Sequence, residues 1–221
     1  FSNLPKSLTC SGFPIREYDN KIPSDLTAEQ ILIRSGNIGS VRIGQKVGEE
    51  KFKLFLSKLG VLKKIDFDIE EVGKPIDFRW GKCPLATASF GHGITTTLLQ
   101  VVKAYSIIVN GGYYIKPTLV KTVKRIKAEK ILDENISIKI LPILRKIVST
   151  KEGTAKLADI YGYDIGGKTG TANKSIKGVY SNEKVNTFVS VFPTKKPKFI
   201  LAVMLDAVSY THLRAHETVS D

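Results

Sequence analysis

The chain has 221 residues, of which 42% are hydrophobic and 25% are charged, which is typical of a folded globular domain and excludes intrinsic disorder. The formal net charge of +13 comes from lysines scattered along the chain, with few aromatic side chains among them. Nucleic-acid binding is therefore not expected, because stacking platforms are missing. The longest apolar run, Phe199–Leu205, is much shorter than the roughly 20 residues that a membrane span needs.

The first two-thirds of the sequence predict helices separated by loops. Residues 1–25 carry many turn-forming residues and predict loop or short strand, and residues 61–93 show no regular period. Apolar residues at helical spacing, or a composition typical of helices, predict six helices. They are expected over Leu26–Arg34, Ile38–Val47, Glu49–Leu59 (closed by Gly60), Thr97–Asn110, Ile140–Val148 and Ala155–Tyr161. Strand is expected over Tyr113–Ile126, broken at Pro117.

The last third predicts β-structure. Val185–Phe192 alternates in the manner of a half-buried strand, and Phe199–Leu205 is a continuous apolar strand. Only six residues connect them, from Pro193 to Lys198. A connection of that length makes an antiparallel hairpin, because a parallel crossover takes a dozen residues or more.

Two regions of the sequence call for separate treatment. Residues 208–221 have no period that continues the preceding strand and resemble translated adapter sequence, so we expect a domain over residues 1–207 and a non-native tail after it. His212 and His216 in that tail have the spacing of helical metal ligands but are discounted with it. Cys10 and Cys83 show no metal-ligand spacing, and their pairing cannot be read from the sequence.

Two short motifs are the best candidates for chemistry. The first, Ser35-Gly-Asn37, lies between two predicted helices, where Ser or Asn could simply cap the second helix. The second, Lys168-Thr-Gly-Thr-Ala172, follows two glycines and precedes the predicted hairpin. Each motif alone is common. In this order and together, they resemble the second and third motifs of the penicillin-recognising serine acyltransferases.

The segments around the motifs sharpen this resemblance. Gly91–Gln100, and Gly166–Ala172 leading into Asn186–Phe192, are similar to class B penicillin-binding proteins, and the last β segment is closer to the septal, cell-division type. The resemblance implies an α/β (α+β) fold with an antiparallel sheet flanked by helices. The sheet is expected over residues 165–172, 185–192 and 199–206, with an all-helical lobe around Ser35–Asn37 and a cleft between the two.

The implied activity is peptidoglycan D,D-transpeptidation, an acyl transfer from D-Ala-D-Ala stem peptides. By resemblance, Ser35 relays a proton, Asn37 holds the substrate amide and Lys168 attracts the substrate carboxylate. The expected substrate-binding residues are Thr169, Gly170 and Thr171. The Thr hydroxyls would bind the carboxylate, Gly170 would let the peptide lie along the strand edge, and the Thr171 N–H would stabilise the oxyanion.

The nucleophile of this family lies in a Ser-x-x-Lys motif upstream of Ser-x-Asn, and the sequence lacks it there. The single match, Ser181–Lys184, follows Lys168 and is in the wrong order. We therefore expect the motif before Phe1, a fold that is incomplete at the N-terminus, and no acylation by this fragment alone.

The resemblance also implies partners and location. Stem peptides and β-lactam antibiotics are the expected ligands, and division-machinery membrane proteins are expected to associate with the full-length protein. No cofactor or metal is expected, because side chains perform the acyl transfer. The full-length protein is expected in the inner membrane with this domain in the periplasm.

Three other interpretations are open at this point. Gly162–Thr169 satisfies the phosphate-loop pattern G-x-x-x-x-G-K-T, although no helical face follows it. The chain could also be a penicillin-fold sensor or scaffold without catalysis, or a β-lactamase.

His92, between two glycines, is a candidate base but fits a loop residue near the cleft better.

Overall fold

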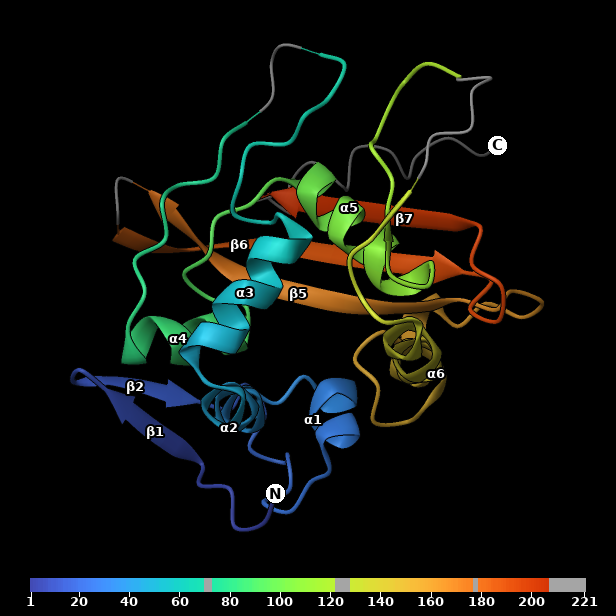
Figure 1. The fold of residues 1–221 in the computed structure, drawn as a ribbon. Helices are drawn as coiled ribbons and strands as arrows, with labels where there is room; N and C mark the ends of the chain where they lie inside the picture. Colours follow the sequence, from blue (N-terminus) through green and yellow to red (C-terminus); the bar gives the residue numbers. More distant parts are fainter. Residues whose placement is uncertain (70–72, 122–127, 177–178, 207–221) are drawn as a thin grey trace, which may run out of the picture.

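The computed structural model describes residues 1–69, 73–121, 128–176 and 179–206. It has two parts, which lie one above the other in Figure 1. A helical lobe with a small β-hairpin forms the N-terminal part, and a three-stranded sheet with two helices packed on it forms the C-terminal part. The predicted α/β class, with its antiparallel sheet and helical lobe, is confirmed.

The helical lobe begins with the hairpin of β1 (Ser7–Cys10) and β2 (Phe13–Arg16). Its helices are α1 (Ala28–Arg34), α2 (Asn37–Val47), α3 (Glu49–Leu59) and α4 (Lys82–Ser89). Thr27 and Gln30 form a capping box at the start of α1, and Gly60 ends α3 in the left-handed conformation. The core of this lobe consists of Leu4, Ile15, Ile22, Leu26, Ile31, Ile38, Val41 and Ala86.

The sheet contains β5 (Gly166–Ile176), β6 (Val179–Phe192) and β7 (Phe199–Asp206), all antiparallel and in the order β5-β6-β7. The predicted hairpin is confirmed, since β6 pairs directly with β7. Lys168 pairs with Val189 in this register. Within the described part of the chain β5 has β6 as its one neighbour, so its other edge carries unpaired backbone groups.

Helices α5 (Leu98–Val109) and α6 (Glu134–Ser149) pack on one face of the sheet, α5 on β7 and α6 on β5 (Figure 1). Their shared core includes Val109, Leu144, Ile147, Val148 and Val191. Two-residue strands β3 (Tyr113–Tyr114) and β4 (Glu129–Lys130) pair beside α5. None of the helices in the described ranges is long and apolar enough to cross a membrane.

Several boundaries differ from the sequence predictions. Helix α4 lies in the stretch expected to be irregular, because its buried residues are mostly small and give a weak period. Helix α6 starts six residues earlier than predicted, capped by Asp133, and it contains Pro142. The expected helix Ala155–Tyr161 is only a 3₁₀ turn at Lys156–Ala158. Of the strand predicted over Tyr113–Ile126, two residues pair, and residues 122–127 lie outside the described ranges.

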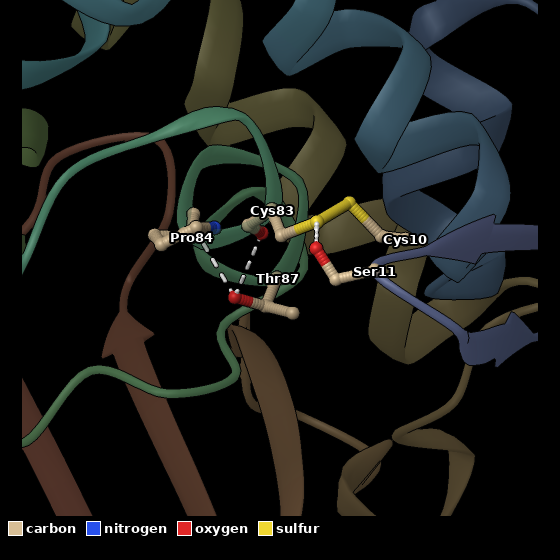
Figure 2. The surroundings of a disulfide bond; sticks show 5 residues. All are labelled: Cys10, Ser11, Cys83, Pro84 and Thr87. Atoms are coloured by element: carbon tan, nitrogen blue, oxygen red, sulfur yellow. Dashed lines mark hydrogen bonds between the residues drawn. A yellow bond between two sulfur atoms is a disulfide. The ribbon is translucent and has the colours of Figure 1, made fainter.

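A disulfide joins the two ends of the helical lobe (Figure 2). Cys10, at the end of β1, is bonded to Cys83, near the start of α4, across 73 residues of sequence. The Ser11 hydroxyl lies 3.2 Å from the Cys83 sulfur, and the Thr87 hydroxyl donates to the Pro84 carbonyl at 3.1 Å. The bond therefore fixes the β1–β2 hairpin to α4.

Candidate active site

Strand β5 brings Lys168 against the end of α1, although the two elements are far apart in the sequence. The Lys168 Nζ donates a hydrogen bond to the Ser35 Oγ at 2.7 Å, across 133 residues, and another to the Thr169 carbonyl at 2.9 Å. The expectation that the two motifs share one place in the fold is therefore met. This contact forms the centre of the candidate site.

The Lys168 ammonium group is partly buried where the sheet meets the helical lobe. Burial lowers the pKa of Lys168 from 10.5 to about 8, because removal from water disfavours the charged form. A lysine with such a pKa is neutral in a substantial fraction of molecules at slightly alkaline pH. It can therefore both attract an anion and exchange a proton with the neighbouring Ser35 hydroxyl.

Ser35 lies in a tight turn between α1 and α2. Its backbone has φ 56° and ψ 39°, the left-handed conformation, and its N–H donates to the Leu32 carbonyl at 3.2 Å. A residue with a Cβ adopts this conformation at a cost of about 1–2 kcal/mol. The sequence interpretation of Ser35 as a helix cap needs correction. Ser35 closes α1, and Gly36 is the N-cap of α2, with no capping side chain of its own.

Asn37 is the first residue of α2. Its side-chain Nδ2 donates to the Arg16 carbonyl at 2.9 Å, so the amide group is held against the end of β2. The backbone N–H groups of Asn37 and Ile38 donate to the carboxylate of Glu17 at 2.7 and 3.0 Å. The residue directly after the N-terminal hairpin thus supplies the cap that Gly36 lacks.

The three residues after Lys168 are placed differently from one another. The Thr169 hydroxyl is 2.8 Å from the Thr154 hydroxyl, which precedes the 3₁₀ turn, and is only partly exposed. Thr171 is exposed, and its hydroxyl donates to the Asn186 Oδ1 at 3.0 Å across the strand pair. Gly170 is exposed between them, and a Cβ there would meet nothing closer than 4.0 Å. The strand edge at Gly170 is therefore open for a ligand.

The phosphate-loop interpretation is wrong. Lys168 lies inside β5, paired with Val189, and the chain continues as strand to Ile176. Because the residues directly after Lys168 are strand up to Ile176, no helix N-terminus begins there to face bound phosphates. Among the residues that the structure describes, no group of three His, Cys, Asp or Glu side chains gathers in a way that could hold a metal ion.

His92 is half-buried in the loop after α4, and its ring stacks on Phe90 with centroids 5.8 Å apart. Burial lowers the pKa of His92, which favours the neutral imidazole. The prediction that His92 is a loop residue is confirmed, and its role as a base is untested.

Sequence reasoning missed three residues that contact the motifs, namely Glu17, Thr154 and Asn186. Glu17 follows a four-residue strand, and no pattern distinguishes it from a surface glutamate. Thr154 follows Gly153 in a loop between two predicted helices, where a turn explains it fully. Asn186 lies in a predicted strand, but its place opposite Thr171 depends on the β5–β6 register, which the sequence did not predict.

The chain is similar to known proteins of one family. The family model for the penicillin binding protein transpeptidase domain matches residues 5–221. The probable peptidoglycan D,D-transpeptidase FtsI of Caulobacter vibrioides is 29% identical over 82% of this chain and 33% of its own length. Stage V sporulation protein D of Bacillus subtilis is 33% identical over 80% of this chain and 30% of its own. The chain thus spans about a third of these curated relatives.

Solved structures share the fold. The transpeptidase domain of Burkholderia pseudomallei penicillin-binding protein 3 superimposes with a TM-score of 0.85 at 23% identity, over 93% of this chain and 63% of that one. Penicillin-binding protein 3 of Mycobacterium tuberculosis, in complex with aztreonam, superimposes with a TM-score of 0.83 at 22% identity, over 92% of this chain and 50% of that one. From the family match over nearly its whole length, the chain belongs to the penicillin-binding protein transpeptidase domain family.

Proposed function

We propose that the complete protein is a serine-type peptidoglycan D,D-transpeptidase that cross-links D-Ala-D-Ala stem peptides. The observation that carries the proposal is the 2.7 Å contact between the Lys168 Nζ and the Ser35 Oγ, in a fold of this family. This contact pairs a lysine of lowered pKa with a hydroxyl group. Such a pair can move a proton during acyl transfer and hold negative charge nearby.

In the proposed reaction, a nucleophilic serine attacks the carbonyl carbon of the penultimate D-Ala, and the bond to the terminal D-Ala nitrogen breaks. The proton from the nucleophile passes through Ser35 to the leaving amine. Lys168 and the hydroxyls of Thr169 and Thr171 bind the carboxylate of the leaving D-Ala. The peptide lies along the open edge of β5 past Gly170, and the Thr171 N–H stabilises the oxyanion. Asn37 holds the substrate amide.

The nucleophile is assigned to a part of the protein outside these 221 residues, since Ser181–Lys184 is the single Ser-x-x-Lys match and follows Lys168. The helical lobe has room for another element. A cavity of about 540 Å³ lies among α1, α2 and α3, lined by side chains that include Ile31, Leu32, Ile43, Val47, Phe52 and Phe55. We propose that the segment carrying the nucleophile packs apolar side chains into this hollow, whose volume is about that of one helical turn. We therefore expect this chain alone not to acylate.

The proposed ligands and location follow from the same assignment. β-Lactams mimic the stem peptide, and the aztreonam and ampicillin complexes of the Mycobacterium tuberculosis neighbour support this choice. We place the domain in the periplasm of an inner-membrane protein that works with division-machinery membrane proteins. The Cys10–Cys83 disulfide supports an oxidising compartment. The septal subtype stays a prediction, as do the domain bounds at residue 207.

Labelled penicillin tests the proposal. The complete protein, with its upstream sequence, should form a covalent adduct detectable by mass spectrometry. Lys168→Ala should lower the acylation rate about 10²- to 10⁴-fold, which is the range for loss of an acid–base group. Its melting temperature should stay within a few degrees of that of the unmodified protein. Lys174→Ala is the matched control, because Lys174 lies on the same strand and pairs with Asp206 at 2.9 Å, away from Ser35.

Two results would overturn the assignment. The first is a complete protein that is folded but takes up no label. The second is a Lys168→Ala variant that is acylated at the rate of the unmodified protein, since the lysine would then have no part in the chemistry.

A further inference from the structure

Three consecutive residues, the last of β2 and the two that follow it, hold the turn that contains Ser35. The Arg16 carbonyl accepts from the Asn37 side chain at 2.9 Å, and the Glu17 carboxylate accepts from the Asn37 N–H. The Tyr18 hydroxyl donates to the Arg34 carbonyl at 2.7 Å. We call residues 16–18 the strap. Its contacts fall on both sides of Ser35, one on the last residue of α1 and the others on the start of α2.

Glu17 makes the central contact of the strap. Its two carboxylate oxygens accept from the first two N–H groups of α2, at 2.7 Å from Asn37 and 3.0 Å from Ile38. Helices normally receive this cap from the side chain of their own N-cap residue. Gly36 has no side chain to give, and a Cβ on Gly36 would lie 3.6 Å from the Glu17 Oε1. The carboxylate therefore takes the place of a local cap.

The cap matters for Ser35 because the turn that holds it is fixed from both α1 and α2. Ser35 is held in the left-handed conformation, which is unfavourable for a residue with a Cβ. The carbonyls of Ile31 and Leu32 fix the turn from the α1 side. On the other side, the start of α2 is fixed by Glu17. A small rotation at this point would move the Ser35 hydroxyl away from Lys168.

The strap itself is anchored away from the site. Ile15, next to it, is buried in the core of the helical lobe, with 7% of its surface exposed. The other strand of the hairpin ends at Cys10, which is bonded to Cys83 on α4 (Figure 2). The position of Glu17 is therefore set by a core residue and by a covalent bond.

We propose that Glu17 is a positioning residue for the Ser35–Asn37 motif, which sets the Ser35 hydroxyl against Lys168 by capping α2 from the strap. The inference rests on the proposed function for its effect on the reaction. The geometric effect, on the Ser35–Lys168 contact, does not depend on that function.

The test compares Glu17→Ala and Glu17→Gln in the complete protein. Glu17→Gln keeps one good acceptor, and Glu17→Ala keeps none. We expect the first-order acylation rate with labelled penicillin to fall about 10- to 100-fold in Glu17→Ala and less in Glu17→Gln, because a small misplacement is enough for such a loss. The noncovalent affinity for penicillin should change little. Asp19→Asn is the control, since the Asp19 side chain accepts locally from the Lys21 N–H.

A second readout needs no penicillin. The pKa of Lys168, measured by NMR of its labelled side chain, should change in Glu17→Ala and remain unchanged in Asp19→Asn. A cap that is merely structural would lower the melting temperature and leave both the acylation rate and this titration unchanged, which overturns the inference. If Glu17→Ala does not fold, Glu17→Gln decides. If the unmodified protein takes up no label, the proposed function fails. The pKa of Lys168 in Glu17→Ala still tests whether Glu17 positions Ser35.

Discussion

Lys168 and Ser35 reach the same place by different means. Lys168 is carried by a regular strand, and its position follows from a continuous antiparallel register in which it faces Val189. Ser35 lies in an irregular turn between two helices, with φ of 56°, and depends on the strap formed by residues 16–18. The two members of the contact therefore differ in what fixes them.

The difference lies in where the supporting contacts come from. A strand position is determined by many backbone hydrogen bonds, so the loss of one side chain leaves it in place. The Ser35 turn has only a few local backbone hydrogen bonds, to the Ile31 and Leu32 carbonyls, and its α2 side depends on side-chain contacts from residues about 20 positions earlier in the sequence. We therefore expect the Ser35 side of the site to be the more sensitive to distant substitutions.

Removal of the disulfide should have the largest effect on stability. In Cys10→Ala combined with Cys83→Ala, the free energy of unfolding should fall by about 2–4 kcal/mol, because a closed loop of 73 residues is released in the unfolded chain. Urea unfolding measures this loss, and a reductant should reproduce it in the unmodified protein. Hydrogen exchange should rise in β1, β2 and α2 more than in β5. An equal rise in β5 would contradict the comparison of the two regions.

The glycines of β5 give the next effect. A Cβ on Gly167 would lie 2.6 Å from the Val189 carbonyl oxygen and 2.8 Å from the Phe188 ring, so Gly167→Ala should lower the free energy of unfolding by about 1–3 kcal/mol. Gly170→Ala is the matched control and should change it by no more than about 0.5 kcal/mol. In the complete protein, Gly170→Ala should instead weaken penicillin binding along the strand edge. Equal stability losses in the two variants would show that β5 is not held as described.

Ser35 separates stability from chemistry. Ser35→Gly and Ser35→Ala both remove the hydroxyl, but only glycine adopts the left-handed conformation freely. Ser35→Gly should be more stable than Ser35→Ala by about 1 kcal/mol, measured by chemical unfolding. Both should slow acylation of the complete protein about 10²-fold. Acylation at the unmodified rate in either variant would mean that Ser35 only shapes the turn.

The pH dependence of stability tests the environment of Lys168. Its pKa is about 8 in the folded protein and 10.5 in an unfolded chain, so the unfolded state binds more protons between these values. The free energy of unfolding should therefore rise with pH from about 8 to 10.5, and the rise should be smaller in Lys168→Met, where the lowered pKa of Lys103 still contributes. Urea unfolding across this range gives the comparison. Parallel pH profiles for the two proteins would show that Lys168 is not desolvated.

The sequence predicted the sheet more successfully than the helical lobe. Alternation in Val185–Phe192 and the short connection to Phe199 indicated the antiparallel pairing, because strand period and loop length are local properties. Helix α4 was missed because most of its buried residues are small, such as Ala86 and Ala88, and give a weak hydrophobic period. The start of α6 was predicted six residues too late, at Ile140 instead of Glu134, and Pro142 lies inside both the predicted and the observed helix.

Local pattern and motif order were enough to identify Ser35, Asn37 and Lys168 as candidates and to assign the family, because residue type and order along the chain are written in the sequence. Only the tertiary structure decided that Glu17 caps α2, that Cys10 bonds to Cys83 and that burial lowers the pKa of Lys168. These features arise when segments distant in sequence pack together, and a contact of that kind leaves no period or spacing in the chain that makes it.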